Sequence, residues 1–458
     1  MGGGGRTGAV ATLAALAALL AVPATGGASV GKFGMAVQPD GRIVVAGGAG
    51  IAIGHGRGKE AGAVARYMPD GKLDRSFGRN GVAIVLTHTD FTDPMQPFTA
   101  VALQPDGRIL VTSPVGELSR LLPDGQLDPG FGVGGVAPAS TISAYYPTSV
   151  AVLPDGSILV GGTTGYLNDP SEHLYGRLYR YTPNGKRSRW VGSMSPSTGT
   201  DDPKSAMSGF LVEPRGRAIA AGAVGPRAPL PPREHLALAR LFTTPPRLVD
   251  EQDRPDPSFA AGAGLVSSGF FPDSPLPESA NALAWDRGKV LVAGQALGAM
   301  LLTRYGRNGT LDHGFGHGGA TVTGVHGPAP DSANAVAVQP SGRIVVAGAT
   351  GHPCPAGECA GLALARYTAK GRLDRGFGND GVVSPRAAAG GQAPPVTEVA
   401  YGVANQPGEG ILVGGLLSGP GRTRFFLRRY LPSGKPDGTF GDAGRVTTLP
   451  LRVARQRG

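Results

Sequence analysis

Seven equivalent positions near the start of recurring apolar segments are the first candidates for a ligand site. Counting back from a repeated turn glycine to the entry of the preceding segment gives Phe33, Thr99, Thr148, Ser208, Asn281, Asn334 and Tyr401, and five of the seven are small and polar. Thr, Ser and Asn side chains can form hydrogen bonds to a small polar ligand or a glycan. They can also satisfy the frayed start of a strand or bind water. The sequence leaves both interpretations open.

Carboxylates stand beside these positions. Glu278 begins "ESANA" and Asp331 begins "DSANA", so the same detail recurs in two units. A lyase or hydrolase acting on a polymer could use loop carboxylates as its catalytic acids, such as Asp93, Asp201, Asp202, Asp273 and Asp331. General acid–base chemistry needs two groups at matched spacing, which a sequence cannot place. Asp beside Pro or Ser more often shapes a loop, so we favour a binding module and keep such an enzyme as the alternative.

The sequence contains no pattern typical of a metal or cofactor site. Turns such as "PDGKLD" lack the alternating acids and the trailing Glu of an EF-hand loop. His313 and His317 are four residues apart, but they stand in a Gly-rich loop that cannot present one helical face. With only two Trp, the chain also matches quinone-binding propellers poorly. We expect no metal and no cofactor.

The N-terminus resembles an export signal. Arg6 supplies a short basic region, residues 8–22 are apolar, and small residues follow in "VPATGGA". We therefore expect a signal peptide over residues 1–28, cleaved after Ala24 or Ala28, and a secreted protein that is not embedded in a membrane. An exported chain with one close cysteine pair predicts a disulfide between Cys354 and Cys359.

Two recurring parts define the elements that must position these residues. The first is an apolar segment, a turn such as "QPDG" and another apolar segment, seen seven times with turn glycines Gly41, Gly107, Gly156, Gly216, Gly288, Gly342 and Gly410. The second is a segment ending in Arg, then a turn, Leu-Asp-x-x-Phe-Gly and a further segment. The phrase "ARYMPDGKLDRSFGRNG" from Ala65 returns as "ARYTAKGRLDRGFGNDG" from Ala365.

Each unit therefore holds four short runs rich in Val, Ile, Leu and Ala, bounded by Pro, Asp and Gly. Four strands per unit, repeated without linkers, are typical of a β-propeller. We predict an all-β, seven-bladed β-propeller over residues 29–449, with four antiparallel strands per blade, followed by a basic tail at 450–458. Units three and four depart most from the pattern.

An arginine ends the third strand of every unit: Arg66, Arg120, Arg180, Arg240, Arg304, Arg366 and Arg429. We expect each to brace its own unit by pairing with the Asp eight residues on, which five units possess. The net charge of +10 is dispersed along the chain, and no basic run alternates with aromatic residues. These features argue against a nucleic-acid partner.

The turns within the two recurring parts must share one face of a propeller, and the remaining connections share the other. Those other connections vary greatly in length and composition, and include residues 87–98, 193–205 and 224–235. Binding sites in repeat proteins lie where loops vary over a rigid scaffold. We expect the ligand site there, at the centre of the ring.

The units over about residues 30–449 resemble the delta-60 repeat family of exported bacterial proteins, on "QPDGRIVVAG" and "ARY-x-x-x-G-x-LD-x-x-FG-x-x-G". The resemblance implies propeller-like repeats and supplies no catalytic residues. We expect a secreted, monomeric binding, adhesion or scaffold module whose partner is a cell-wall polymer, a glycan or a protein.

Overall fold

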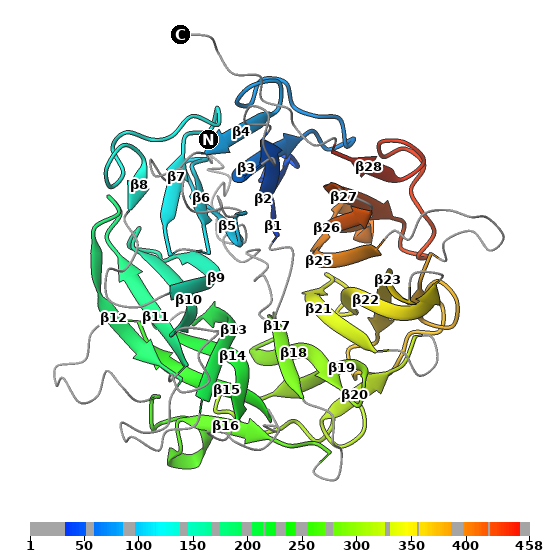
Figure 1. The fold of residues 1–458 in the computed structure, drawn as a ribbon. Coiled ribbons are helices and arrows are strands. Elements are labelled where there is room, and N and C mark those ends of the chain that lie inside the picture. The colour runs from blue at the N-terminus through cyan, green and yellow to red at the C-terminus, as the bar shows by residue number, and fades with distance from the viewer. Residues whose placement is uncertain are drawn as a thin grey trace, which may run out of the picture.

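The structure is a computed structural model that describes residues 33–51, 59–85, 97–114, 116–137, 145–165, 174–194, 204–213, 216–225, 235–243, 255–271, 278–325, 330–354, 357–385, 397–419 and 422–448. These residues form a ring of seven four-stranded sheets, drawn in Figure 1. The predicted signal peptide and basic tail lie outside the described residues.

The seven blades follow one another along the chain. Blade 1 consists of β1 (Gly34–Val37), β2 (Ile43–Ile51), β3 (Lys59–Tyr67) and β4 (Val82–Val85). Blade 2 consists of β5 (Ala100–Leu103), β6 (Ile109–Thr112), β7 (Leu118–Leu121) and β8 (Val136–Ala137). Blade 3 consists of β9 (Tyr145–Val152), β10 (Ile158–Thr164), β11 (Tyr175–Tyr181) and β12 (Arg187–Ser193). Blade 4 consists of β13 (Lys204–Val212), β14 (Arg217–Gly225), β15 (His235–Phe242) and β16 (Leu265–Ser268).

Blade 5 consists of β17 (Ser279–Asp286), β18 (Lys289–Ala296), β19 (Ala299–Tyr305) and β20 (Ala320–Thr323). Blade 6 consists of β21 (Asp331–Val338), β22 (Ile344–Cys354), β23 (Gly357–Tyr367) and β24 (Val382–Val383). Blade 7 consists of β25 (Thr397–Asn405), β26 (Ile411–Gly419), β27 (Arg422–Tyr430) and β28 (Arg445–Thr447). Helix in the described residues is limited to the 3₁₀ turns η2 (Ala260–Gly262) and η3 (Pro407–Glu409), and no helix there is long and apolar enough to cross a membrane.

Every sheet is an antiparallel meander whose strands keep the order of the chain, as in β1-β2-β3-β4. The prediction of seven blades with four antiparallel strands each is confirmed. Blades 1 and 7 are built only from their own strands, so packing between them closes the ring without a shared strand.

The first strand of each blade is the innermost. β1, β5, β9, β13, β17, β21 and β25 contact one another in succession, and β25 contacts β1 (Figure 1). A meander that starts at the axis places the first-to-second and third-to-fourth connections on one face of the ring. We call this the turn face, represented by residues 38–42 and 68–81. At the opposite face the second strand leads into the third and the fourth strand leads into the next blade. We call this the loop face, represented by Leu297 and Gly298 between β18 and β19.

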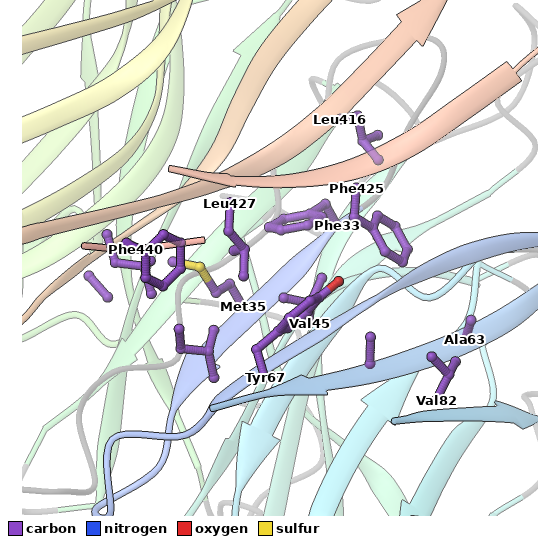
Figure 2. Packing of buried hydrophobic residues seen from close by; sticks show 14 residues of the cluster. Phe33, Met35, Val45, Ala63, Tyr67, Val82, Leu416, Phe425, Leu427 and Phe440 are labelled. Carbon is purple, nitrogen blue, oxygen red and sulfur yellow. The ribbon is translucent and has the colours of Figure 1, made fainter. Parts of the chain in front are cut away.

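Buried apolar clusters fill the spaces between neighbouring blades. Between blades 7 and 1, Phe33 and Met35 pack against Phe425, Leu427 and Phe440 (Figure 2), and the rings of Phe33 and Phe425 meet edge to face with centroids 5.8 Å apart. Full burial of a large apolar side chain stabilises a fold by about 1.5–3 kcal/mol. This packing of strands that are far apart in the sequence holds the ring closed.

The arginine that ends the third strand links two blades. In blade 1, Arg66 donates through Nε to Asp74 at 2.8 Å, and its guanidinium lies 4.6 Å from the ring centroid of Phe77. Its Nη1 donates to the carbonyl of Pro123 in blade 2. We call this set of Arg, Asp and Phe the arginine bracket. The same bond to the following blade is made by Arg120 to Pro183, Arg180 to Thr243, Arg240 to Arg307, Arg304 to Ala369, Arg366 to Pro432 and Arg429 to Pro69.

The predicted pairing of each arginine with the Asp eight residues on is confirmed in five blades, for Asp74, Asp128, Asp312, Asp374 and Asp437. Blade 4 uses Asp256, sixteen residues after Arg240. In blade 3 Arg180 pairs instead with Asp155, which lies on the preceding turn. The arginines therefore brace their own units, as predicted, and also bind the next blade, which the sequence did not predict.

The Phe-Gly step brings neighbouring blades close together. A Cβ placed on Gly71 of blade 1, where φ is +87°, would lie 3.0 Å from the ring of Phe440 in blade 7. The adjacent Gly441 donates its N–H to the carbonyl of Asp70 at 2.9 Å. Only a residue without a side chain fits at Gly71. The Phe of this phrase therefore packs its aromatic ring between two blades.

Candidate functional site

The predicted polar ring coincides with irregularities in the innermost strands. The pairing of first and second strands shifts register in five blades, and the residue left unpaired is in each case the predicted one: Thr148, Ser208, Asn281, Asn334 and Tyr401. Such β-bulge residues bend the strand and redirect a side chain. In blade 2, Thr99 directly precedes β5, and in blade 1 the equivalent Phe33 directly precedes β1.

Three of these side chains reach the next blade. Nδ2 of Asn281 donates to the carbonyl of Ala333, and Nδ2 of Asn334 donates to the carbonyl of Ala400, both at 3.0 Å. Oγ1 of Thr148 donates to the carbonyl of Met207, also at 3.0 Å. Each acceptor directly precedes the bulge residue of the following blade.

The acceptor atoms of the two amides also have partners within the protein. Oδ1 of Asn281 accepts from Ser279 at 3.3 Å, and Oδ1 of Asn334 accepts from Ser332 at 3.1 Å. The Nδ2 bonds join successive inner strands and the Oδ1 bonds stay within one strand, so a ligand at the ring would have to compete with both.

The other members of the ring are also withdrawn from solvent. Thr99 is fully buried and exchanges a 2.8 Å hydrogen bond with Thr112 of the neighbouring strand. Ser208 is buried, and Tyr401 is half-buried, so burial raises the pKa of its phenol. A ligand role for this ring remains a prediction.

The two predicted carboxylates, Glu278 and Asp331, accept hydrogen bonds from the backbone of the connection that leads into their own blade. Glu278 accepts the backbone N–H groups of Phe270 at 3.1 Å and Phe271 at 2.8 Å, and Oδ2 of Asp331 accepts from the N–H of Val325 at 2.6 Å. Both side chains are buried, and Oδ1 of Asp331 has no hydrogen-bond partner within the part of the chain that the structure describes. The other loop carboxylates named above, Asp93, Asp201, Asp202 and Asp273, lie outside the described residues.

A third carboxylate occupies the equivalent position in blade 7 and was missed from the sequence. Glu398 stands three residues before Tyr401, as Glu278 stands before Asn281. It accepts two parallel hydrogen bonds from Arg428, at 2.7 and 2.9 Å. Extending the comparison of "ESANA" and "DSANA" to "TEVAY" would have found the carboxylate. Its arginine partner lies thirty residues away and could not be assigned from spacing.

Nothing in the described part of the chain gathers three or more His, Cys, Asp or Glu side chains as a metal site would require. His313 and His317 are both exposed, and Nδ1 of His313 contacts the carbonyl of Gly318 at 3.3 Å. Asp side chains of the turns cap the backbone instead, as Asp70 accepts from the N–H of Lys72 at 3.0 Å.

The two cysteines lie where β22 and β23 meet at the loop face. Backbone pairing places Cys354 opposite Gly357 and Cys359 opposite His352. The side chains of both cysteines lie outside what the structure describes. The disulfide remains a prediction.

Comparisons with known proteins agree with the fold. A family model described as "Domain of unknown function (DUF5122) beta-propeller" matches residues 38–77 and 104–131, which supports a propeller repeat family. No curated protein matches the chain.

Among solved structures, the chain is similar to the extracellular domain of BT4673 from B. thetaiotaomicron (11% identity, TM-score 0.40), with 91% of the chain covered. It spans 46% of the length of that protein. It is also similar to the polysaccharide lyase Uly1 (13% identity, TM-score 0.47), with 86% of this chain and 88% of that chain covered. A quinohemoprotein alcohol dehydrogenase from Pseudomonas putida HK5 matches with 11% identity and a TM-score of 0.39, over 90% of this chain and 71% of that one.

Proposed function

We propose that the protein is an exported, monomeric binding module that takes a polar polymer, such as a cell-wall glycan, on its loop face. The observation that carries this proposal is the contrast between the two faces. The turn face repeats one arrangement, with an arginine donating to the next blade at all seven junctions. The connections of the loop face have no common length, from two residues between β18 and β19 to fourteen between β4 and β5.

Binding is favoured over catalysis because the described acids at the loop-face end of the inner strands already have partners. Glu278 and Asp331 accept backbone N–H groups, and Glu398 is paired with Arg428. A general acid or base must instead reach a substrate proton. The likeness of the units to delta-60 repeats and the signal-like residues 1–28 support export.

A binding screen on glycans and cell-wall polymers tests this function. Asn281→Ala and Asn334→Ala each remove one amide-to-carbonyl bond from the loop-face end of an inner strand. The matched control is Asn405→Ala, because Asn405 stands at the turn-face end of β25 and donates to the carbonyl of Val338 at 2.7 Å. Each variant should lose about 1 kcal/mol of stability.

Only the two loop-face variants should weaken polymer binding, by tenfold or more. Equal binding by all three variants would show that the polar ring serves architecture alone. Release of shortened or unsaturated fragments from a bound polymer would favour the alternative, a lyase or hydrolase.

A further inference from the structure

One face of the blade 7 sheet carries arginines at two positions that are uncharged in the other blades. Its third strand carries Arg428 directly before the bracket arginine, and the fourth strand begins with Arg445. At the position of Arg428 the other blades carry small or uncharged residues: Ala65, Ser119, Tyr179, Ala239, Thr303 and Ala365. At the position of Arg445 they carry apolar residues, among them Val82, Val136 and Val382. Because the scaffold forms without these arginines elsewhere, their presence here needs another reason.

The strand register places these charges on one side of the sheet. Leu417 pairs with Glu398 on one strand and with Arg424 on the next, while Arg428 pairs with Arg445. Residues directly opposite in an antiparallel pair share a face, and so do residues two or four apart along one strand. Three arginines and one glutamate therefore face the same way.

The glutamate neutralises one arginine of the three. Arg428 holds both carboxylate oxygens of Glu398, and Nη2 of Arg445 stays 4.0 Å from the nearer one. Among the described residues, Nε of Arg445 has no hydrogen-bond partner. No ion pair or hydrogen bond engages Arg424 in the described part of the chain.

The connection that precedes β25 supplies no negative charge to this face. The connection that leads into β25 crosses from blade 6, and residues 386–396 read "RAAAGGQAPPV". This segment holds no carboxylate and adds a further arginine. The sequence of this connection therefore offers no carboxylate to pair with Arg424 or Arg445.

Arg424 and Arg445 line one surface cavity of about 510 Å³ along the outer edge of blade 7. Its wall also includes Leu417, Val446 and the exposed Thr447, together with the exposed Asp442, whose carboxylate offsets one of the two arginine charges and leaves the lining with one net positive charge. Guanidinium groups match a carboxylate through paired donors. The apolar side chains and the hydroxyl match the carbon–hydrogen face and the hydroxyl groups of a sugar.

We infer that this cavity binds an acidic sugar unit of a uronate type, with Arg424 and Arg445 holding its carboxylate. A bare inorganic anion would use the arginines and leave the apolar wall uncovered, so the carbohydrate is favoured. The site lies on the rim of the ring and is independent of the proposed loop-face function.

Calorimetric titration with trigalacturonate tests the inference, with a neutral galactose trisaccharide and inorganic phosphate as comparison ligands. The variant Arg424→Ala/Arg445→Val restores residues that other blades use, Ala61 and Val82, and should therefore fold. The control Arg75→Ala/Arg79→Ala removes the same charge from two exposed arginines of blade 1. We expect trigalacturonate binding to fall at least tenfold in the first variant and to change less than twofold in the control.

Arg445→Lys keeps the positive charge but loses the planar guanidinium with its paired N–H donors. It should therefore weaken trigalacturonate binding severalfold without lowering the melting temperature. The inference is overturned if both double variants lose binding equally, since total charge then explains the effect. It is also overturned if the wild-type protein does not bind trigalacturonate, or if phosphate competes as well as the acidic sugar.

Discussion

Replacing the bracket arginine of blade 6 should destabilise the ring far more than replacing that of blade 3. Arg366 donates to Asp374 at 2.9 Å, stacks 4.5 Å from the ring centroid of Phe377 and donates to the carbonyl of Pro432 in blade 7. Arg180 donates to the carbonyl of Thr243 at 3.1 Å, but its carboxylate partner is Asp155, which is 55% exposed.

The contacts set the expected magnitudes. A hydrogen bond that involves a charged group contributes about 1.5–3 kcal/mol, and a partly desolvated cation–π contact adds about 0.5–2 kcal/mol. Asp374 keeps a second partner in Arg343 at 3.1 Å, which reduces the cost of its lost partner. We therefore expect Arg366→Ala to cost about 4 kcal/mol, within the range for breaking a buried pair. For Arg180→Ala we expect about 1.5 kcal/mol, because an exposed ion pair contributes little.

Urea unfolding followed by circular dichroism measures the difference, with the midpoint and slope compared for the two variants. Arg366→Lys supplies an intermediate case, since it keeps the charge but cannot serve Asp374 and Pro432 together. We expect it to cost about 2 kcal/mol, roughly one charge-assisted hydrogen bond.

A cost for Arg180→Ala equal to that for Arg366→Ala would refute this reasoning. It would mean that the bond to the next blade carries the whole effect and that the Asp and the Phe add nothing. If both alanine variants lose less than about 1 kcal/mol of unfolding free energy, the apolar clusters alone stabilise the junctions between blades.

Three further predictions follow from the same contacts. Leu297→Asn should raise stability by about 1 kcal/mol in urea titrations, because φ is +55° at this two-residue turn, where Asn-Gly is preferred. The hydrogen bond from Lys289, helped by Arg304, outweighs the effect of burial and lowers the pKa of Asp312 below its ordinary 3.8. The stability that this shift contributes is present above about pH 4 and is lost as the pH falls further. Acid unfolding of the wild type and of Asp312→Asn should show this difference. Burial raises the pKa of Tyr367 to about 12 and outweighs the effect of its hydrogen bond to Thr323. Absorbance at about 295 nm should therefore show this phenol ionising only near that pH. The stability that the shift contributes is present below the ordinary pKa of 10 and should be lost as the pH rises toward 12.

The number and order of the blades could be predicted because they depend on local signals. Each hairpin has its own turn glycine, accompanied by Pro, Asp or both in the turn or beside it, and the left-handed φ of +84° at Gly41 is a requirement that only a few residue types meet easily. Seven copies of that signal predict seven hairpins, and the meander follows from the short connections. Blade 3 forms without the Leu-Asp-x-x-Phe-Gly phrase, since its third and fourth strands pair directly across residues 182–186.

The positions of the polar ring could also be predicted from the sequence, but the structural reason for a polar residue at each position could not. Asn281 and Asn334 stand out as polar residues in apolar strands, yet the sequence does not show that each is the unpaired residue of a bulge. Bulges depend on the register between two strands, and register is fixed by side chains packing on both faces.

Repetition along the chain therefore determined what each blade is, and the closed ring determined what joins the blades. Arg66 and Asp74 are eight residues apart, so spacing could pair them, whereas Arg66 and Pro123 meet only because blade 2 docks against blade 1. The same holds for Arg428 and Glu398, which lie on the third and first strands of one sheet. Contacts of this kind form when distant segments bury a shared apolar surface, and no local preference of the residues specifies them in advance.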